Sequence, residues 1–465
     1  MQLLPELFTL GFSLFFLFLS LGRKKQSAFV AARLLALILL VVTLFGMGAR
    51  GQLFSGAYQV DLFSQIFKFL LAAGLCLVVF MLENNDDIKS DYLPEYFMLL
   101  GFSTLGLMML VSAVELITIA VSLEISSFSL YAVVPLRKSH DKTHLEAAVK
   151  YLFFGAIATG IMIYGMGYLY GMSHTTYLAG IITRLPEFLT QKIGILALAL
   201  ALTLAAFFFK LSLFPLHFWA PDVYEGASNT TTAFIATVPK IAATAVLLRL
   251  LLPLSGVASG LPLFLILLAA FSMTLGNLVG LVQKDIKRLL AFSGIAHAGY
   301  LMMGILPFSK DGGAAAIYYM LVYLIMTLAC FYVVILISRQ GKNVSLGTLA
   351  GLAKRSPLLA FTLAAAAFSL AGIPPTGGFT GKLFLFVSAF KAGYLNIVLI
   401  GAINTVLSMF YYLNLVRMAY SREAEEPGEI PLAFHQKALC YVFIFLIFYL
   451  GLCPFGILDF FRQAV

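Results

Sequence analysis

A series of long apolar runs separated by short polar segments is the feature that most constrains this chain. A helix needs about 20 residues to cross the hydrocarbon core of a bilayer, and in lipid the crossing element must satisfy its own backbone polar groups. The runs therefore predict an all-α integral membrane protein with about fourteen spans. The expected spans are residues 4–22, 28–47, 62–82, 95–112, 114–135, 145–170, 193–219, 230–252, 261–281, 288–307, 313–338, 357–390, 394–416 and 438–460.

Composition supports the membrane class. Of the 465 residues, 61% are hydrophobic and 11% are charged, whereas a soluble domain carries about 25% charged residues. Runs of this length differ from the ten-residue alternation of an outer-membrane barrel. The net charge of +9 lies mostly in short loops and forms no basic domain. We therefore expect the lipid bilayer as a partner and no nucleic acid.

Loop charges predict the orientation. The first run has no basic residue before it, and Arg23, Lys24 and Lys25 follow it, which is the reverse of a cleaved signal peptide. With the N-terminus outside, seventeen Lys and Arg residues lie in or beside inside loops and seven in or beside outside loops. Positive residues favour the inside, so this bias predicts an uncleaved first helix, an outside N-terminus and an even number of spans.

No sequence pattern indicates a cofactor or a metal on this chain. The cysteines show no CxxC or Cys/His spacing and lie scattered through apolar segments, so we expect reduced, buried thiols. No nucleotide-binding loop, haem motif or iron–sulfur motif is present in the sequence either. Any redox cofactor is therefore expected on other chains. The four cysteines are Cys76, Cys330, Cys440 and Cys453.

Two spans contain helix breaks: KLSLFP at residues 210–215 and AGIPPTGGF at residues 371–379. Proline removes a backbone donor, and backbone freed at membrane depth must be buried in protein or line a wet cavity. Paired breaks at matching places in two halves are typical of transporters. They fall in the seventh and twelfth spans, which predicts two inverted five-helix repeats, helices 4–8 and 9–13. Lys210 and Lys382 would then be symmetry-related.

Ionisable residues inside the apolar runs are the candidate functional residues. Lys210, Lys240 and Lys382 lie within expected spans, and Glu124 lies deep in the fifth. A charge near the bilayer centre costs roughly 2.5–3.5 kcal/mol on the insertion scale, so packing alone does not explain four of them. We interpret these residues as part of a path for protons or ions.

Burial gives these groups a way to switch charge. Desolvation favours the neutral form of a lysine, and a nearby carboxylate favours its charged form. Glu124 close to Lys210 would therefore hold a proton on the amine. Separating the pair, or bringing another positive charge toward it, would release that proton. Ser127 and Tyr131 share the helix face of Glu124, whereas Glu115 lies on the opposite face and is expected at the interface.

Several polar positions leave two interpretations open. His297 suits a proton relay or is a satisfied packing residue. Glu146 and Lys150 form an i,i+4 pair near the inner edge of the sixth span, and the pair is structural or marks proton entry. Three residues after the first break feed a half-channel or form a solvated loop: His217, Asp222 and Glu225. Three in the thirteenth span hold water or bond between helices: Asn396, Asn404 and Ser408.

Four segments together resemble the signature of the subunit N family of bacterial NADH-quinone oxidoreductase, respiratory complex I. They are residues 210–227 (KLSLFPLHFWAPDVYEGA), 283–291 (QKDIKRLLA), 293–300 (SGIAHAGY) and 371–382 (AGIPPTGGFTGK). The resemblance covers about residues 95–420, and the two ends match in span pattern only.

The resemblance implies an antiporter-like subunit with fourteen helices in the bacterial inner membrane. The chain would divide into an N-terminal three-helix segment (1–94), a first antiporter-like repeat (95–252), a second repeat (253–420) and a C-terminal helix (421–465). Its implied partners are other membrane subunits of complex I, an antiporter-like neighbour and small membrane subunits among them.

By motif, the charged residues of the family fall on Glu124, Lys150, Lys210, Lys240 and Lys382, and the His297 segment is one of the matching motifs. The resemblance implies that these residues translocate protons as part of a translocase. NADH oxidation and quinone reduction would occur on other subunits, with no cofactor on this chain.

Two other kinds of complex remain open from the residues alone. One is a multisubunit sodium–proton antiporter, which has the same fold and no redox partner. The other is a membrane-bound hydrogenase complex. A purely structural membrane anchor would not need three intramembrane lysines.

Overall fold

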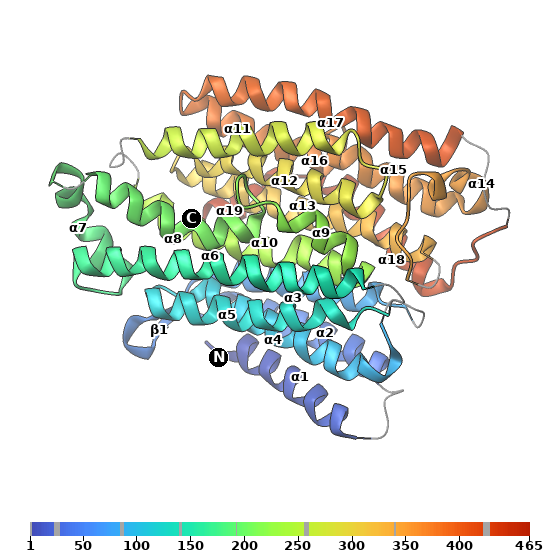
Figure 1. The fold of residues 1–465 in the computed structure, drawn as a ribbon, viewed down its shortest axis with the longest axis horizontal. Helices are drawn as coiled ribbons and strands as arrows, with labels where there is room; N and C mark the ends of the chain where they lie inside the picture. The colour runs from blue at the N-terminus through green and yellow to red at the C-terminus, as the bar shows by residue number, and fades with distance from the viewer. Residues whose placement is uncertain are drawn as a thin grey trace.

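The computed structural model describes residues 2–22, 28–83, 88–138, 142–191, 193–254, 260–338, 341–421 and 428–465. Within these residues the chain is mostly helical, with one hairpin of β1 (Gly51–Leu53) and β2 (Tyr58–Val60). Most helices run along the longest axis of the molecule (Figure 1). The helices are α1 (Leu4–Leu21), α2 (Ala28–Phe45), α3 (Leu62–Met81), α4 (Leu93–Ser112), α5 (Leu116–Val133), α6 (Thr143–Ser173), α7 (Leu178–Gln191), α8 (Ile193–Leu211), α9 (Trp219–Gly226), α10 (Asn229–Leu251), α11 (Leu261–Gly280), α12 (Ile286–Ile305), α13 (Lys310–Ile337), α14 (Leu352–Arg355), α15 (Pro357–Ala371), α16 (Gly377–Lys391), α17 (Leu395–Ser421), α18 (Phe434–Leu452) and α19 (Phe455–Arg462).

The helices confirm the predicted all-α membrane fold. Twelve of the described helices are long and apolar enough to cross a bilayer. The tenth predicted span is α12, a helix of 20 residues, and the twelfth is the broken pair α15 and α16. These two complete the fourteen predicted crossings.

Two helices differ from the expected spans. α7 occupies part of the segment between the sixth and seventh spans, for which no helix was predicted. The last predicted span, 438–460, is divided into α18 and α19 at Cys453 and Pro454. Proline cannot donate a backbone hydrogen bond to the preceding turn, which accounts for the interruption.

Matching contacts show the two inverted repeats. Gly106 of α4 packs against the backbone of α5, and Gly276 of α11 packs in the same way against the backbone of α12. α5 and α12 each begin after an acidic N-cap, Glu115 and Asp285, whose carboxylate accepts from the N–H three residues on. Each matching pair is 170 residues apart. Because five crossings separate them, the second repeat is inverted relative to the first.

The two helix breaks share one backbone motif. Ser212 and Gly372 are left-handed, with φ of 61° and 84°. The next residue in each case donates its N–H to a carbonyl five residues earlier, at 2.9 Å, as in a Schellman cap. Each break also contains a cis X–Pro bond, Phe214–Pro215 and Pro374–Pro375. Equivalent residues of the two breaks are thus 160 positions apart.

This equivalence corrects the predicted symmetry of two lysines. Lys210 lies in the last turn of α8, before its break, whereas Lys382 lies in α16, after the other break. In the aligned breaks Lys210 corresponds to Leu370, and Lys382 corresponds to Asp222. The prediction was wrong because nearness to a break does not specify which half-helix carries the side chain.

Short bridges between loops show which loops share a membrane face. At the end where α12 begins, the bridged pairs are Ile88 with Arg137 and Asp285 with Ser345. At the end where α5 begins, they are Tyr58 with Ala113 and Glu115 with Tyr177. These ends are called the α12 end and the α5 end below. Because successive helices cross the membrane in opposite directions, the two loops of each pair must lie on the same face. The predicted orientation assigns the α12 end to the cytoplasm.

Candidate functional site

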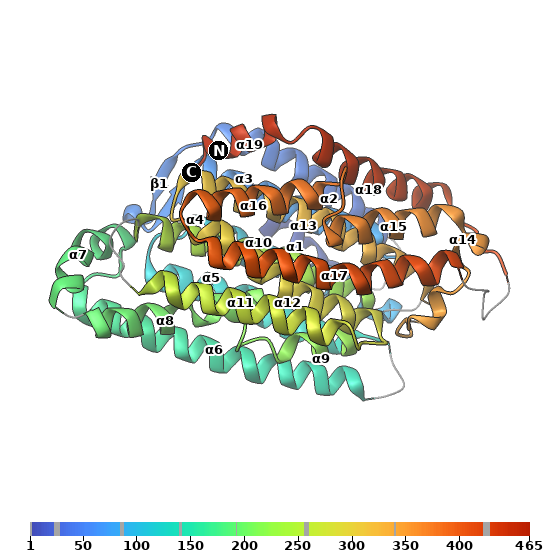
Figure 2. The ribbon, with the colours of Figure 1, turned by 90° about the horizontal axis from the view of Figure 1, so that it is seen from above.

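The three predicted lysines are all buried. Their exposed fractions are 3% for Lys210, 2% for Lys240 and 3% for Lys382. They come from three different helices of the bundle, α8, α10 and α16. In the view turned by 90°, α10 lies between α8 and α16, and α17 passes across the middle in front of them (Figure 2). The lysine amines are therefore enclosed by the helix bundle rather than exposed at its surface.

Lys210 lies among aromatic rings. Its amine is 5.9 Å from the centre of the Tyr131 ring and 5.7 Å from that of Tyr151. Within the described part of the chain, the amine has no hydrogen-bond acceptor. Its electrostatic partner is the carboxylate of Glu124. This arrangement brings the predicted pair together and places Tyr131 beside it.

Glu124 is half-buried on α5. It accepts a hydrogen bond of 2.6 Å from the Thr159 hydroxyl of α6. Ser127, which shares its helix face, instead donates to the Leu123 carbonyl of the same helix. Glu115 lies apart from this group as the N-cap of α5. It is buried rather than exposed as expected, because capping draws its carboxylate onto the backbone.

Lys240 lies beside a water-sized cavity. Its Nζ donates to the Gly294 carbonyl at 3.3 Å and lies 5.6 Å from the Tyr323 ring centre. A cavity of about 10 Å³ separates it from His297. Such a volume is about that needed for a single water molecule. Leu211, the neighbour of Lys210 in the chain, forms part of the wall and so connects the two lysine environments.

His297 is held by two tyrosine hydroxyls. Its Nδ1 is 2.5 Å from the Tyr319 hydroxyl, and its Nε2 is 3.0 Å from the Tyr412 hydroxyl. A neutral imidazole donates from one ring nitrogen and accepts at the other, so this geometry satisfies either tautomer. His297 also interacts electrostatically with Lys240 and Lys382. It therefore lies between the two lysines.

Lys382 caps the broken end of α15. Its Nζ donates to the carbonyls of Leu370 and Ala371, both at 3.0 Å. The last carbonyls of a helix have no partner within the helix, and a cation is favourable at its negative end. The amine also lies 4.7 Å from the Tyr300 ring centre. The helix break thus supplies the binding site of the amine.

Together these residues form a row across the membrane interior, and we call it the buried row. Its members, in order, are Glu124, Lys210, Lys240, His297 and Lys382. Five helices supply them, and tyrosine rings or a small cavity fill the intervals. A row of this kind can hold protons at several buried sites and shift them between neighbours.

Lys150 lies outside the buried row. It is half-buried near the α12 end, where it pairs with Glu146 at 2.7 Å and with Asp222 at 2.6 Å. Arg288 continues the network to Asp222 at 3.0 Å and to Glu225 at 2.7 Å. We call these five residues the surface ion network. They join α6, α9 and α12, so Asp222 and Glu225 are paired rather than simply solvated.

Other predicted polar residues have local roles. Asn404 accepts from Asn277 of α11 at 3.1 Å, which is ordinary bonding between helices. Asn396 is exposed, and Ser408 donates to the carbonyl of Thr405 within its own helix. His217 is buried against the Phe214 ring. These residues do not join the buried row.

Sequence reasoning missed most of the tyrosines and one buried ion pair. Six tyrosines adjoin the row: Tyr131 was expected from its helix face, and the close spacing of tyrosines in α13 and α17 was a signal for three others. Lys68 is fully buried and lies 2.6 Å from Glu6, which also bonds the Tyr58 hydroxyl at 2.5 Å. Lys68 lies in an apolar run, so its position could have marked it as a candidate, although not its partner. The six tyrosines are Tyr131, Tyr151, Tyr300, Tyr319, Tyr323 and Tyr412.

Comparison with known proteins identifies the family. Residues 113–408 match the family described as NADH:quinone oxidoreductase/Mrp antiporter, TM. NADH-quinone oxidoreductase subunit N 2 of Solidesulfovibrio magneticus is 47% identical over 92% of this chain and 90% of its own length. The chain belongs to the subunit N family of NADH-quinone oxidoreductase. The matched region contains every residue of the buried row, and the family predicted from the four sequence segments is confirmed.

Solved structures share the fold of the subunit N family. A chain in respiratory complex I from Thermus thermophilus with bound aureothin is 33% identical, with a TM-score of 0.85 and 98% coverage of both chains. A chain of the Mrp complex from Dietzia sp. DQ12-45-1b is 21% identical, with a TM-score of 0.81 and coverage of 100% of this chain and 95% of that one. The second likeness concerns the fold alone.

Proposed function

We propose that this chain is the proton-translocating membrane subunit N of a bacterial NADH-quinone oxidoreductase. The observation that carries the proposal is the buried row from Glu124 to Lys382, which no packing requirement explains. Uncompensated burial of a charge is strongly unfavourable. The chain belongs to a family whose proteins are subunits of an oxidoreductase rather than isolated channels. This family membership gives the buried row a function.

The mechanism follows from the partners of each lysine. Glu124 favours a proton on Lys210, and the carbonyls of Leu370 and Ala371 favour one on Lys382. Among the described residues, Lys240 donates to one carbonyl, at 3.3 Å, so its proton is held less firmly by hydrogen bonds. A proton arriving on one member raises the electrostatic energy of its protonated neighbours. Proton release at one end of the row can therefore be driven by charge movement at the other.

The partners and location of the chain complete this proposal. We place it in the bacterial inner membrane with its N-terminus outside, as the bias of loop charges predicts. Other membrane subunits of complex I, including an antiporter-like neighbour and small membrane subunits, would contact its exposed apolar faces. NADH oxidation and quinone reduction are assigned to other subunits, and no cofactor to this chain.

The alternative of a cation–proton antiporter subunit is favoured by one observation, the shared fold of the Mrp complex chain. Sodium-dependent alkalinisation in vesicles without NADH would support it. Proton uptake that requires NADH and a quinone would support the oxidoreductase.

Lys210→Ala tests the proposal in membrane vesicles containing the whole complex. We expect proton translocation driven by NADH to be lost, while assembly of the complex on a native gel stays intact. Lys391→Ala is the matched control, since Lys391 is an exposed lysine at the end of α16. Unchanged translocation in Lys210→Ala would refute a role for the buried row.

A further inference from the structure

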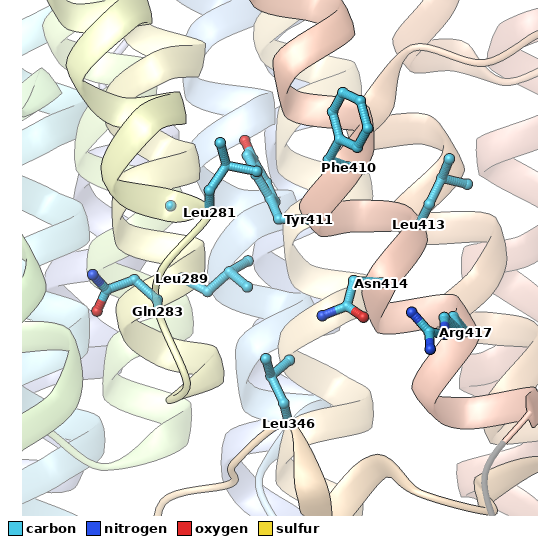
Figure 3. A pocket seen from close by; sticks show the side chains of 10 residues that line it. Leu281, Gln283, Leu289, Leu346, Phe410, Tyr411, Leu413, Asn414 and Arg417 are labelled. Atoms are coloured by element: carbon cyan, nitrogen blue, oxygen red, sulfur yellow. The ribbon is translucent and has the colours of Figure 1, made fainter.

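A pocket of about 400 Å³ opens at the α12 end, beside the surface ion network, since Arg288 Nε donates to the side chain of the pocket residue Gln283 at 3.3 Å. It lies where α11 ends, α12 begins and α17 approaches its last turns. Figure 3 shows Gln283 on one side of this space and Asn414 on the other, with Leu346 below them. Its position at the ends of three helices places it at the membrane surface rather than at the bilayer centre.

The pocket combines apolar walls with polar groups at its mouth. Leu281 and Phe410 supply apolar surface, whereas Gln283, Asn414 and Arg417 supply amides and a guanidinium. Arg417 is exposed, and no ion pair holds it within the described residues. A polar cavity with hydrogen-bonding partners retains water, unlike an apolar one. The volume is far greater than one water molecule needs.

Tyr411 connects the pocket to the protein interior. It lines the pocket although only 3% of the residue is exposed. Its hydroxyl donates to the Asn277 side chain at 2.9 Å. Its ring centre is 4.4 Å from that of Tyr412, the next residue of α17, so the two side chains are in ring contact. Tyr411 therefore contacts the pocket on one side and the buried side chains of Asn277 and Tyr412 on the other.

From Tyr412 the path reaches the buried row. The Tyr412 hydroxyl makes a short hydrogen bond with Ser293 and lies 3.0 Å from His297 Nε2. His297 adjoins the cavity beside Lys240. Each group in this sequence can both donate and accept a hydrogen bond. Every group from Tyr411 to His297 is therefore of a kind that can pass on a proton.

A branch leads from the same pocket toward Lys382. Asn277, which accepts from Tyr411, donates to Asn404 at 3.1 Å, and the next residue, Thr405, donates to the Tyr300 hydroxyl at 3.3 Å. The Tyr300 ring lies 4.7 Å from the amine of Lys382. The pocket therefore leads toward both His297 and Lys382.

We propose that this pocket is the mouth of a proton access path, in which Tyr411, Ser293 and Tyr412 pass protons between pocket water and His297. The proposal rests on the proposed function and deepens it by assigning a route from the α12 end. In each step a hydroxyl accepts a proton on its oxygen and gives its own proton to the next group. No net charge stays on the tyrosines, and His297 delivers the proton through the small cavity toward Lys240.

Single tyrosine variants of the whole complex in inside-out vesicles test the route. Tyr411→Phe and Tyr412→Phe keep the rings and remove only the hydroxyls. We expect proton uptake per NADH oxidised to fall about fivefold, the effect of one lost hydrogen bond in the transfer step. Tyr420→Phe, on an exposed face of α17, should translocate as the parent does. Parental uptake in both Tyr411→Phe and Tyr412→Phe overturns the route.

Reagent access provides a second, independent measurement. Asn414→Cys is made in a Cys453→Ser background, because Cys453 is exposed whereas Cys76, Cys330 and Cys440 are buried. A membrane-impermeant methanethiosulfonate added to inside-out vesicles should modify position 414 and reduce proton uptake. Val406→Cys, on an exposed apolar face of α17 deeper in the span, should not react. An unreactive position 414 means that lipid or a partner fills the pocket, and this overturns the route.

Lys210→Ala separates failure of the route from failure of the proposed function. If Lys210→Ala abolishes translocation while both tyrosine variants keep it, the access route is wrong and the proton-translocating function stands. If Lys210→Ala also keeps full translocation, the proposed function fails and the route fails with it.

Discussion

Lys382 folds back onto Gly372, the left-handed residue at which α15 ends. A Cβ atom at Gly372 would lie 3.0 Å from Lys382 Cδ and 3.5 Å from its Nζ. The absence of this atom lets the amine reach the carbonyls of Leu370 and Ala371. The helix break and the buried charge are therefore one structural unit, with the backbone turn shaping the site and the lysine satisfying the turn.

Gly372→Ala should therefore displace the amine. The left-handed conformation costs an alanine roughly 1–2 kcal/mol, and the new methyl group would lie 3.0 Å from Lys382 Cδ. We expect reduced thermal stability together with loss of proton translocation. Gly393→Ala is the matched control, because Gly393 has a similar φ of 86° and nothing within 4 Å of the added carbon. It should lose similar stability and keep translocation, and equal loss in both variants would contradict the coupling.

His297→Gln distinguishes a proton relay from a packing residue. Glutamine offers one donor and one acceptor to Tyr319 and Tyr412, but it does not titrate. We expect the complex to keep its melting temperature and to lose proton translocation. His297→Leu leaves the Tyr319 hydroxyl without its partner, whereas Tyr412 keeps Ser293, and should destabilise the protein by about 1–3 kcal/mol. If His297→Gln translocates normally, the histidine is only a packing residue.

Filling the cavity between Lys240 and His297 should affect stability and proton translocation differently. Gly294 lies within α12, where alanine is favoured over glycine by up to about 1 kcal/mol. The added carbon would lie 3.0 Å from Lys240 Nζ and 3.1 Å from the Tyr323 hydroxyl. Gly294→Ala should therefore raise the melting temperature or leave it unchanged, while slowing proton translocation.

A second glycine provides the control for this variant. Gly160 lies within α6 and has nothing within 4 Å of an added Cβ, so Gly160→Ala gains helix propensity without touching the row. It should translocate normally. A Gly294→Ala complex that also translocates normally would show that the small cavity takes no part in transfer.

The sequence predicted the features that depend on local chain properties. A membrane span is a continuous apolar run, so most helix bounds agree with expectation to within a few residues. A charge within such a run stands out for the same reason, which made Lys210, Lys240 and Lys382 visible. Whether these lysines function stays a prediction until the variants are measured.

Contacts between distant helices were not predictable in this way. Tyr319 of α13 and Tyr412 of α17 hydrogen-bond to His297 of α12. In the sequence, a tyrosine in an apolar run resembles an ordinary core residue. The Lys68–Glu6 pair joins α3 to α1, and nothing in either run specifies the other. The symmetry of Lys210 and Lys382 failed for a related reason, because the direction of each side chain relative to its break is set by backbone turns.

Asp61 yields a prediction of pH dependence outside the membrane spans. It caps α3 and accepts from the Ser64 N–H at 2.8 Å and from Arg249 Nη2 at 2.8 Å. Burial raises the pKa of Asp61, but the Arg249 guanidinium and the capping bonds outweigh burial and hold this pKa below its ordinary value. A carboxylate with a depressed pKa in the folded state stabilises the fold above its unfolded pKa of about 4. This contribution is lost as the pH falls through the folded pKa.

Asp61→Asn should therefore act differently at neutral and acidic pH. The amide keeps a capping oxygen but loses the ion pair, so we expect destabilisation of about 1 kcal/mol at pH 7. The difference should shrink only below about pH 4, as the pH falls through the depressed pKa of the folded carboxyl. Melting temperatures of the purified complex in detergent between pH 7 and about pH 2 measure both effects. A constant difference across that range would show that the Asp61–Arg249 pair does not control the acid sensitivity of this end of the protein.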